Sequence, residues 1–83
     1  MPSVVAVRAL EPYRVWLRFS DRTEGVADLA DLVARGGVFE PLREAGEFAK
    51  VRLVRSFGTI EWPGGVDLDP DALHSRVLAG ASR

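Results

Sequence analysis

The sequence predicts an α+β fold built on a small, mostly antiparallel sheet. Three observations indicate this: short alternating segments near the N-terminus, a second pair of strand-like segments after residue 50, and a strong helix start near residue 70. An N-terminal three-strand meander and a C-terminal hairpin would form the sheet, with short helices and a C-terminal helix packed on it. The 83 residues contain no linker, repeat or low-complexity segment. We therefore expect residues 1–83 to form a single domain.

The meander is expected between residues 4 and 27. Val4–Leu10 is short and rich in β-branched residues, which favour strands. Tyr13–Phe19 alternates apolar and polar or bulky positions with the period of two that defines a strand. A tight turn over residues 20–22 would return the chain as a third strand, Thr23–Ala27. Gly25 inside that strand indicates a β-bulge.

Short helical segments are expected in the middle of the chain. Asp28 is a suitable capping residue for a helix over Leu29–Ala34, and Gly36 follows as a typical helix end. Within Val38–Phe48, Pro41 and a glycine leave room for only one short helical turn. We therefore expect little regular structure in Val38–Phe48.

A second hairpin is expected from Val51–Phe57 and Thr59–Trp62, with Gly58 at the turn. The first strand would place three apolar residues on one face: Val51, Leu53 and Phe57. Trp62 is expected in the core because a ring of that size buries a large apolar area. The Pro-Gly-Gly segment at residues 63–65 is then expected to lead the chain out of the sheet.

The C-terminal helix has the clearest start signal in the sequence. Asp69 supplies a capping carboxylate, and Pro70 suits the first helical position. We expect the helix to end at Gly80. Its inward-facing residues at helical spacing are Pro70, Leu73, His74, Val77 and Leu78.

Composition excludes several classes of function. Eleven basic and twelve acidic residues give a net charge of −1, which argues against a general electrostatic grip on nucleic acid or an anionic membrane. The absence of cysteine excludes a disulfide scaffold, a thiol nucleophile and a thiolate metal site. No apolar run approaches the length of a membrane span, and charged residues interrupt the first apolar stretch. We expect a cytoplasmic protein.

Residues with catalytic or metal-binding chemistry are few. Asp67–Asp71 alternates aspartates like a calcium loop, but the sixth and twelfth positions of such a loop hold Ala72 and Leu78. A helix cap is the favoured interpretation. His74 is the only histidine, and its place on the apolar helix face favours packing over a role as a general base. We expect no enzyme activity, no metal and no cofactor.

The most suggestive surface is the second face of the second strand. It places Trp16 between Arg14 and Arg18, with Arg8 on the neighbouring strand. Three interpretations remain open: core or local cation–π packing, a protein-binding hot spot, or a platform for single-stranded nucleic acid. The slight excess of acidic residues in the chain argues against the third interpretation, a platform for single-stranded nucleic acid.

Two segments resemble a known family. Gly58–His74 and Tyr13–Asp21 are similar to the strand, turn and proline-initiated helix of domain of unknown function family 2442, which comprises short bacterial proteins. The resemblance extends to three apolar residues of the middle segment: Phe39, Leu42 and Phe48. Three positions depart from the family pattern, two in turns and one in the last helix: Gly64, Arg22 and His74. A non-glycine residue in a left-handed turn position carries a steric cost.

The resemblance implies a small α+β fold but no established activity or cofactor. Members are often encoded beside another short protein in pairs that look like toxin–antitoxin modules, and some are fused to a helix-turn-helix domain. We therefore expect a protein-interaction module, the antitoxin-like or regulatory half of a two-gene bacterial system. Its contact surface would be Arg14, Trp16 and Arg18, and its partner an adjacent-gene product or a second copy. The alternative is a nucleic-acid-binding module that uses the same residues.

Overall fold

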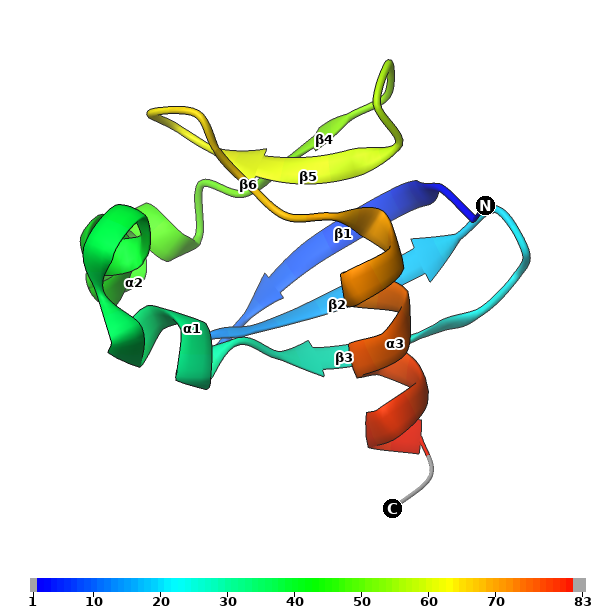
Figure 1. Ribbon diagram of the computed structural model, residues 1–83, viewed down its shortest axis with the longest axis horizontal. Helices are drawn as coiled ribbons and strands as arrows, with labels where there is room; N and C mark the ends of the chain where they lie inside the picture. Colours follow the sequence, from blue (N-terminus) through cyan, green and yellow to red (C-terminus); the bar gives the residue numbers. More distant parts are fainter. Residues whose placement is uncertain (1, 82–83) are drawn as a thin grey trace.

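The N-terminal meander forms as predicted. A computed structural model describes residues 2–81 and contains strands β1 (Val4–Leu10), β2 (Arg14–Phe19) and β3 (Glu24–Asp28). The three strands are antiparallel in the order β1-β2-β3 (Figure 1). β3 begins one residue later than expected. The turn before it holds Arg22 at a φ of 72°, the left-handed conformation that the sequence suggested.

The bulge of this sheet lies in β1 and not at Gly25, so that prediction is wrong. The register of β1 against β2 shifts between Val4 and Ala6, whereas β2 and β3 pair without interruption. Gly25 has a different role: a Cβ built on it would lie 3.0 Å from Cγ1 of Val77. The glycine therefore allows the C-terminal helix to approach the sheet closely.

The middle of the chain is more helical than predicted. Helix α1 spans Ala30–Arg35, and the Asp28 carboxylate accepts a 2.9 Å hydrogen bond from the Ala30 amide at its start. The expectation of a single helical turn within Val38–Phe48 is wrong, because a 3-10 helix, η1 (Gly37–Arg43), is followed by α2 (Ala45–Phe48). Proline lacks an N–H but can still accept, and the Pro41 carbonyl takes a hydrogen bond from Glu44.

The second sheet has three strands, one more than the expected hairpin. β4 (Arg52–Val54), β5 (Thr59–Trp62) and β6 (Val66–Asp67) are antiparallel in that order. Residues 63–65 do not leave the sheet, because two glycines at φ values of 93° and 81° reverse the chain into β6. Phe57 lies in the β4–β5 turn with 78% of its surface exposed, so its predicted place on the apolar strand face is also wrong.

The C-terminal helix α3 spans Pro70–Ala81 and continues through Gly80, the predicted end. A Cβ at Gly80 would lie 3.3 Å from the Val26 carbonyl oxygen, so glycine is compatible with close packing here. Leu73 and Val77 are buried, as expected. Leu78 is half exposed, which contradicts its predicted inward position, since only a narrow stripe of α3 meets the sheet.

The core lies between the two sheets and under α3 (Figure 1). Trp62 is fully buried, as predicted, and its Nε1 donates a 2.8 Å hydrogen bond to the Phe48 carbonyl. β2 contributes three fully or almost fully buried residues from its inner face: Val15, Leu17 and Phe19. Within residues 2–81, no helix combines the length and apolar character needed to cross a membrane.

Candidate functional site

The face of the N-terminal sheet opposite the core carries the residues singled out in the sequence. Arg8, Trp16 and Val26 lie directly opposite one another across the three strands, because their Cα atoms are register partners. We call this surface the outer face. It comprises one set of alternating residues from each strand: Ala6, Arg8, Leu10, Arg14, Trp16, Arg18, Glu24, Val26 and Asp28.

Trp16 lies half-buried on the outer face, and two arginines beside it are held by local contacts. The Arg18 guanidinium carbon is 5.5 Å from the centre of the Trp16 ring, a cation–π distance. Arg18 Nε also donates to the Glu24 carboxylate at 2.9 Å. Arg14 donates to the Glu11 carbonyl at 2.7 Å. Local cation–π packing, one of the three interpretations left open by the sequence, therefore describes Arg18, while Arg8 is the register partner of Trp16 on β1.

Arg8 differs from these two arginines. It is exposed, and among residues 2–81 nothing forms a hydrogen bond or an ion pair with its guanidinium. Arg8, Leu10 and Trp16 line a shallow depression of about 200 Å³. The outer face thus offers an unpaired cation beside a partly exposed indole.

The far side of the outer face borders α3. A depression of about 320 Å³ runs from β2 and β3 to the end of this helix, lined by Arg14, Val26, Asp28, Arg76, Ala79 and Gly80. Arg76 bonds Asp31 through both nitrogens at 2.9 and 3.0 Å and also donates to the Asp28 carbonyl. This two-point contact lowers the pKa of Asp31 and raises the pKa of Arg76. Arg76 therefore fixes α3 against β3.

His74 has the packed environment that the sequence predicted. Its Nε2 lies 2.9 Å from a carboxylate oxygen of Asp21, and its ring packs edge-on to Phe19 at 4.8 Å. The Asp21 carboxylate also accepts from the Thr23 amide, and this hydrogen bond, together with His74, lowers the pKa of Asp21. His74 thus connects α3 to the β2–β3 turn.

The aspartate string before α3 forms a helix start, as expected. The backbone carbonyl of Asp69 accepts a 3.1 Å hydrogen bond from the Leu73 amide. Its carboxylate accepts a 3.4 Å hydrogen bond from the Asp71 amide. In the described part of the chain, no three acidic or histidine side chains converge in the manner of a metal site.

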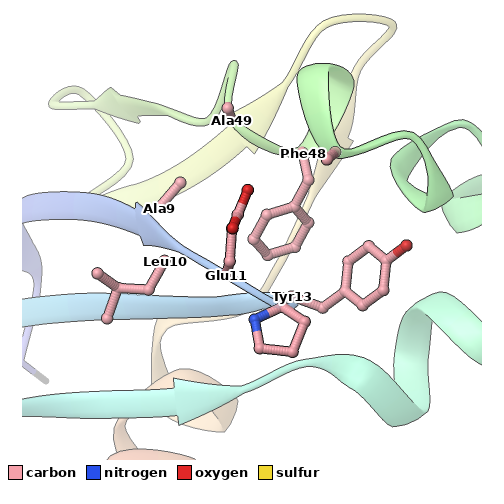
Figure 2. Close-up of a pocket in the computed structure, with 8 residues that line it drawn as sticks. Ala9, Leu10, Glu11, Tyr13, Phe48 and Ala49 are labelled. Carbon is pink, nitrogen blue, oxygen red and sulfur yellow. The ribbon is translucent and has the colours of Figure 1, made fainter.

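A feature that the sequence did not reveal lies at the end of β1. A groove of about 380 Å³ separates β1 and the following turn from α2, and we call it the edge groove (Figure 2). It is lined by Ala9, Leu10, Glu11, Pro12, Tyr13, Ala45, Phe48 and Ala49. Two of these lining residues, Tyr13 and Phe48, meet edge-on with ring centres 5.5 Å apart. Residues far apart in the sequence build it, so no local pattern could have indicated it.

Together, these features define a small α+β module that presents an arginine- and tryptophan-bearing sheet face. Residues 4–77 match the model of the protein family of unknown function DUF2442, and the chain belongs to this family. The family resemblance seen in the sequence is confirmed. No significant match was found among curated proteins.

The fold also has a counterpart among solved structures. The chain is similar to a crystal structure named "Putative DNA Binding Protein" from Nitrosomonas europaea ATCC 19718, with a TM-score of 0.86 and 24% identity. The similarity covers 99% of this chain and 52% of the solved chain, so this protein spans about half the length of that neighbour. The comparison confirms the α+β fold.

Proposed function

We propose that this protein is a protein-interaction module and that the outer face contacts its partner. The observation that carries the proposal is the row Arg8–Trp16–Val26, in which an unpaired arginine and a 39% exposed valine flank a half-buried tryptophan. Tryptophan and arginine are among the residues most enriched in binding hot spots. A half-buried ring is also already oriented by its neighbours, so little conformational entropy is lost when a partner covers it.

The contacts around Trp16 support binding without any chemical step. Glu24 bonds Arg18 beside the indole, and the Glu11 carbonyl accepts a hydrogen bond from Arg14, so both guanidinium groups have local partners. Arg18 is neutralised by Glu24, whereas Arg14, which donates to a neutral carbonyl, and the unpaired Arg8 keep a positive charge that suits a partner carrying carboxylates. We propose that the chain binds a protein and is not an enzyme.

The biological role follows the family resemblance and belongs to the same proposal. We propose that the chain is the antitoxin-like or regulatory half of a two-gene bacterial system that acts in the cytoplasm. Its partner is then the product of the adjacent gene. A second copy of the chain is the alternative partner for the same surface.

Nucleic-acid binding is the second candidate function, and the name of the solved neighbour favours it. Arg8, Arg14 and Arg18 could meet phosphates while bases stack on Trp16. Against it, the chain has a net charge of −1, and Glu24 and Asp28 lie on the same face. In addition, the neighbour's name refers to a chain of which this protein matches only 52%.

A partner-binding experiment tests the proposal. The tagged protein is used to capture the adjacent-gene product under a salt wash, and the affinity of that pair is then measured by calorimetry. Trp16→Ala should weaken binding about tenfold or more, which corresponds to ~1.4 kcal/mol. Phe57→Ala is the matched control, because Phe57 is an exposed aromatic residue on the other sheet. A Trp16→Ala affinity within a factor of two of the wild-type value would refute the proposed surface.

The same preparation separates the two candidate functions. Retention of single-stranded DNA or RNA on a filter at low salt, with affinity that falls steeply as salt rises, would favour the nucleic-acid function. A protein complex that survives the salt wash favours the interaction module, because its central contact is the burial of an indole.

A further inference from the structure

The outer edge of β1 is open for hydrogen bonding at Val7 and Ala9, whereas the start of the strand is bonded to the second sheet, because the Val4 amide donates to the Gly58 carbonyl at 2.8 Å. The Phe19 amide donates to Thr23 and the Leu29 amide donates to Tyr13, so the odd-numbered residues of β2 bond toward β3. In an antiparallel ladder the alternate residues then bond toward the other neighbour. Across the register of β1 and β2, Arg8 and Leu10 therefore bond to β2, whereas Val7 and Ala9 direct their N–H and C=O groups away from it.

The open edge coincides with the edge groove. Ala9 lines this groove, and β1 ends in its wall (Figure 2). Leu10 lines both the edge groove and the depression beside Trp16, so the two hollows meet at this residue. A strand added to β1 would direct alternate side chains into the edge groove and onto the outer face.

Each of the two hollows carries one unpaired charge. Glu11 directs its carboxylate toward the space between Ala9 and Phe48 (Figure 2). Over residues 2–81, neither this carboxylate nor the Arg8 guanidinium has a hydrogen-bonding or ionic partner. The edge groove therefore favours a basic side chain at its Glu11 end, and the outer face favours an acidic side chain beside Arg8.

A second copy of β1 does not supply these charges. Val4–Leu10 reads VVAVRAL, so its only charged residue is Arg8. Glu11 follows the strand, but it is an odd number of residues from Arg8 and belongs to the other face, so a paired second copy does not place its Glu11 directly opposite Arg8. A strand from a different protein can satisfy both positions. The edge of β1 therefore favours a heterologous partner.

We propose that an extended segment of the protein partner adds to the edge of β1 as a fourth, antiparallel strand. The inference rests on the proposed function and specifies how the partner binds. Opposite Glu11, Ala9 and Arg8, the segment carries a basic, an apolar and an acidic residue in that order. Backbone hydrogen bonds to Val7 and Ala9 supply affinity, and the charge pattern supplies specificity.

A peptide titration tests this directly. The probe is the capped peptide Lys-Thr-Leu-Glu-Val, which places lysine opposite Glu11 and glutamate opposite Arg8. Its control is Glu-Thr-Leu-Lys-Val, which has the same composition with the charges exchanged. By NMR, the probe should shift the amide signals of Val7 and Ala9 and slow their hydrogen exchange, while the Arg8 amide is already bonded to β2. The control should bind about tenfold more weakly.

Two variants test the backbone and the charge separately. Ala9→Pro removes the N–H that points away from β2, which an edge strand tolerates, and should abolish the peptide-induced shifts. Glu11→Lys should remove or reverse the preference between the two peptides. Glu40→Lys makes the same charge change at an exposed position outside the edge groove and should preserve the preference. Because Glu11→Lys leaves the strands unaltered, it decides the question even if Ala9→Pro unfolds.

The outcomes separate this inference from the proposed function. Absence of shifts at Val7 and Ala9 at millimolar peptide, or equal affinity for both peptides, overturns the added strand. If the captured partner loses affinity with Trp16→Ala but not with Glu11→Lys, the outer face is the interface and the edge is not. If the peptide binds as expected but Trp16→Ala leaves the partner unaffected, the proposed surface fails while the edge site stands.

Discussion

Asp21 shows how much one side chain contributes at the β2–β3 turn. Its carboxylate accepts from the Thr23 amide and contacts His74, so it closes the turn and connects the turn to α3. The neighbouring Arg22 has a φ of 72°, a conformation that is costly for arginine. The contacts of Asp21 therefore stabilise a turn whose next residue carries backbone strain.

Asp21→Asn should lower stability near neutral pH and have little effect in acid. The folded state lowers the pKa of Asp21, so the ionised carboxylate stabilises the fold above about pH 4. That contribution is lost as the pH falls through the lowered pKa, because the wild-type group then becomes neutral like asparagine. Melting temperatures of both proteins across the range from about pH 7 to pH 2 measure the difference.

Glu40→Gln is the control for this pH dependence. Glu40 is exposed, and in the described part of the chain its carboxylate has no hydrogen-bonding partner. A constant difference between wild type and Asp21→Asn at all pH values would show that the turn depends on the shape of the side chain and not on its charge.

At the level of the elements, α3 packs closely on β3 at one pair of residues, Gly25 on the strand and Val77 on the helix. Gly25 lies opposite Leu17 on the inner face, and the buried Val77 occupies the space that a Gly25 side chain would need. The absence of a side chain on β3 thus sets the distance between the helix and the sheet.

Gly25→Ala should destabilise the protein by about 1–3 kcal/mol, because its new methyl group would overlap Val77. The loss should be smaller by about 0.5 kcal/mol or more in a Val77→Ala background, where the overlapping atom is gone. Urea unfolding of the two single variants and the double variant measures this coupling. Additive effects would mean that α3 moves away from β3 without cost.

The elements also show which parts of the fold a sequence can reveal. The alternation of Tyr13–Phe19 and the Asp69–Pro70 start signal are local patterns, and both elements formed within one residue of the predicted bounds, β2 from Arg14 and α3 from Pro70 to Ala81. The 3-10 helix η1 depends on the backbone conformation around Pro41, and strand β6 depends on the conformations of the two glycines before it. The local sequence allows several backbone conformations at these positions. Packing against the core selects one of these conformations, and a local sequence pattern contains no information about that packing.

The candidate surfaces divide in the same way. The period of two placed Arg14, Trp16 and Arg18 on one face, and the structure has them there. The edge groove joins Ala9 to Phe48, which is brought near β1 by the docking of α2. A surface within one strand is therefore accessible to sequence reasoning, while a groove between distant segments is not.

The whole molecule should unfold in one step, because both sheets share one core. Val15 and Leu17 from the first sheet and Ile60 and Trp62 from the second are fully buried in the same cluster. With Trp16→Phe, Trp62 becomes the only indole, and its fluorescence reports the packing of the core around the second sheet. Its fluorescence and the far-ultraviolet circular dichroism should then give the same urea midpoint. Separate midpoints would show that the sheets unfold independently.

The contact between Arg76 and the carbonyl of Asp28 has a consequence for stoichiometry. Asp28 belongs to the alternate set of β3 residues that points away from β2, and α3 covers this edge from Val26 to Asp28. The N-terminal sheet can therefore lengthen only on the β1 side. A molecule with one growing side and one closed side terminates after a single addition. A complex formed through this sheet is thus expected to stop at one partner strand per chain and not to extend into a filament.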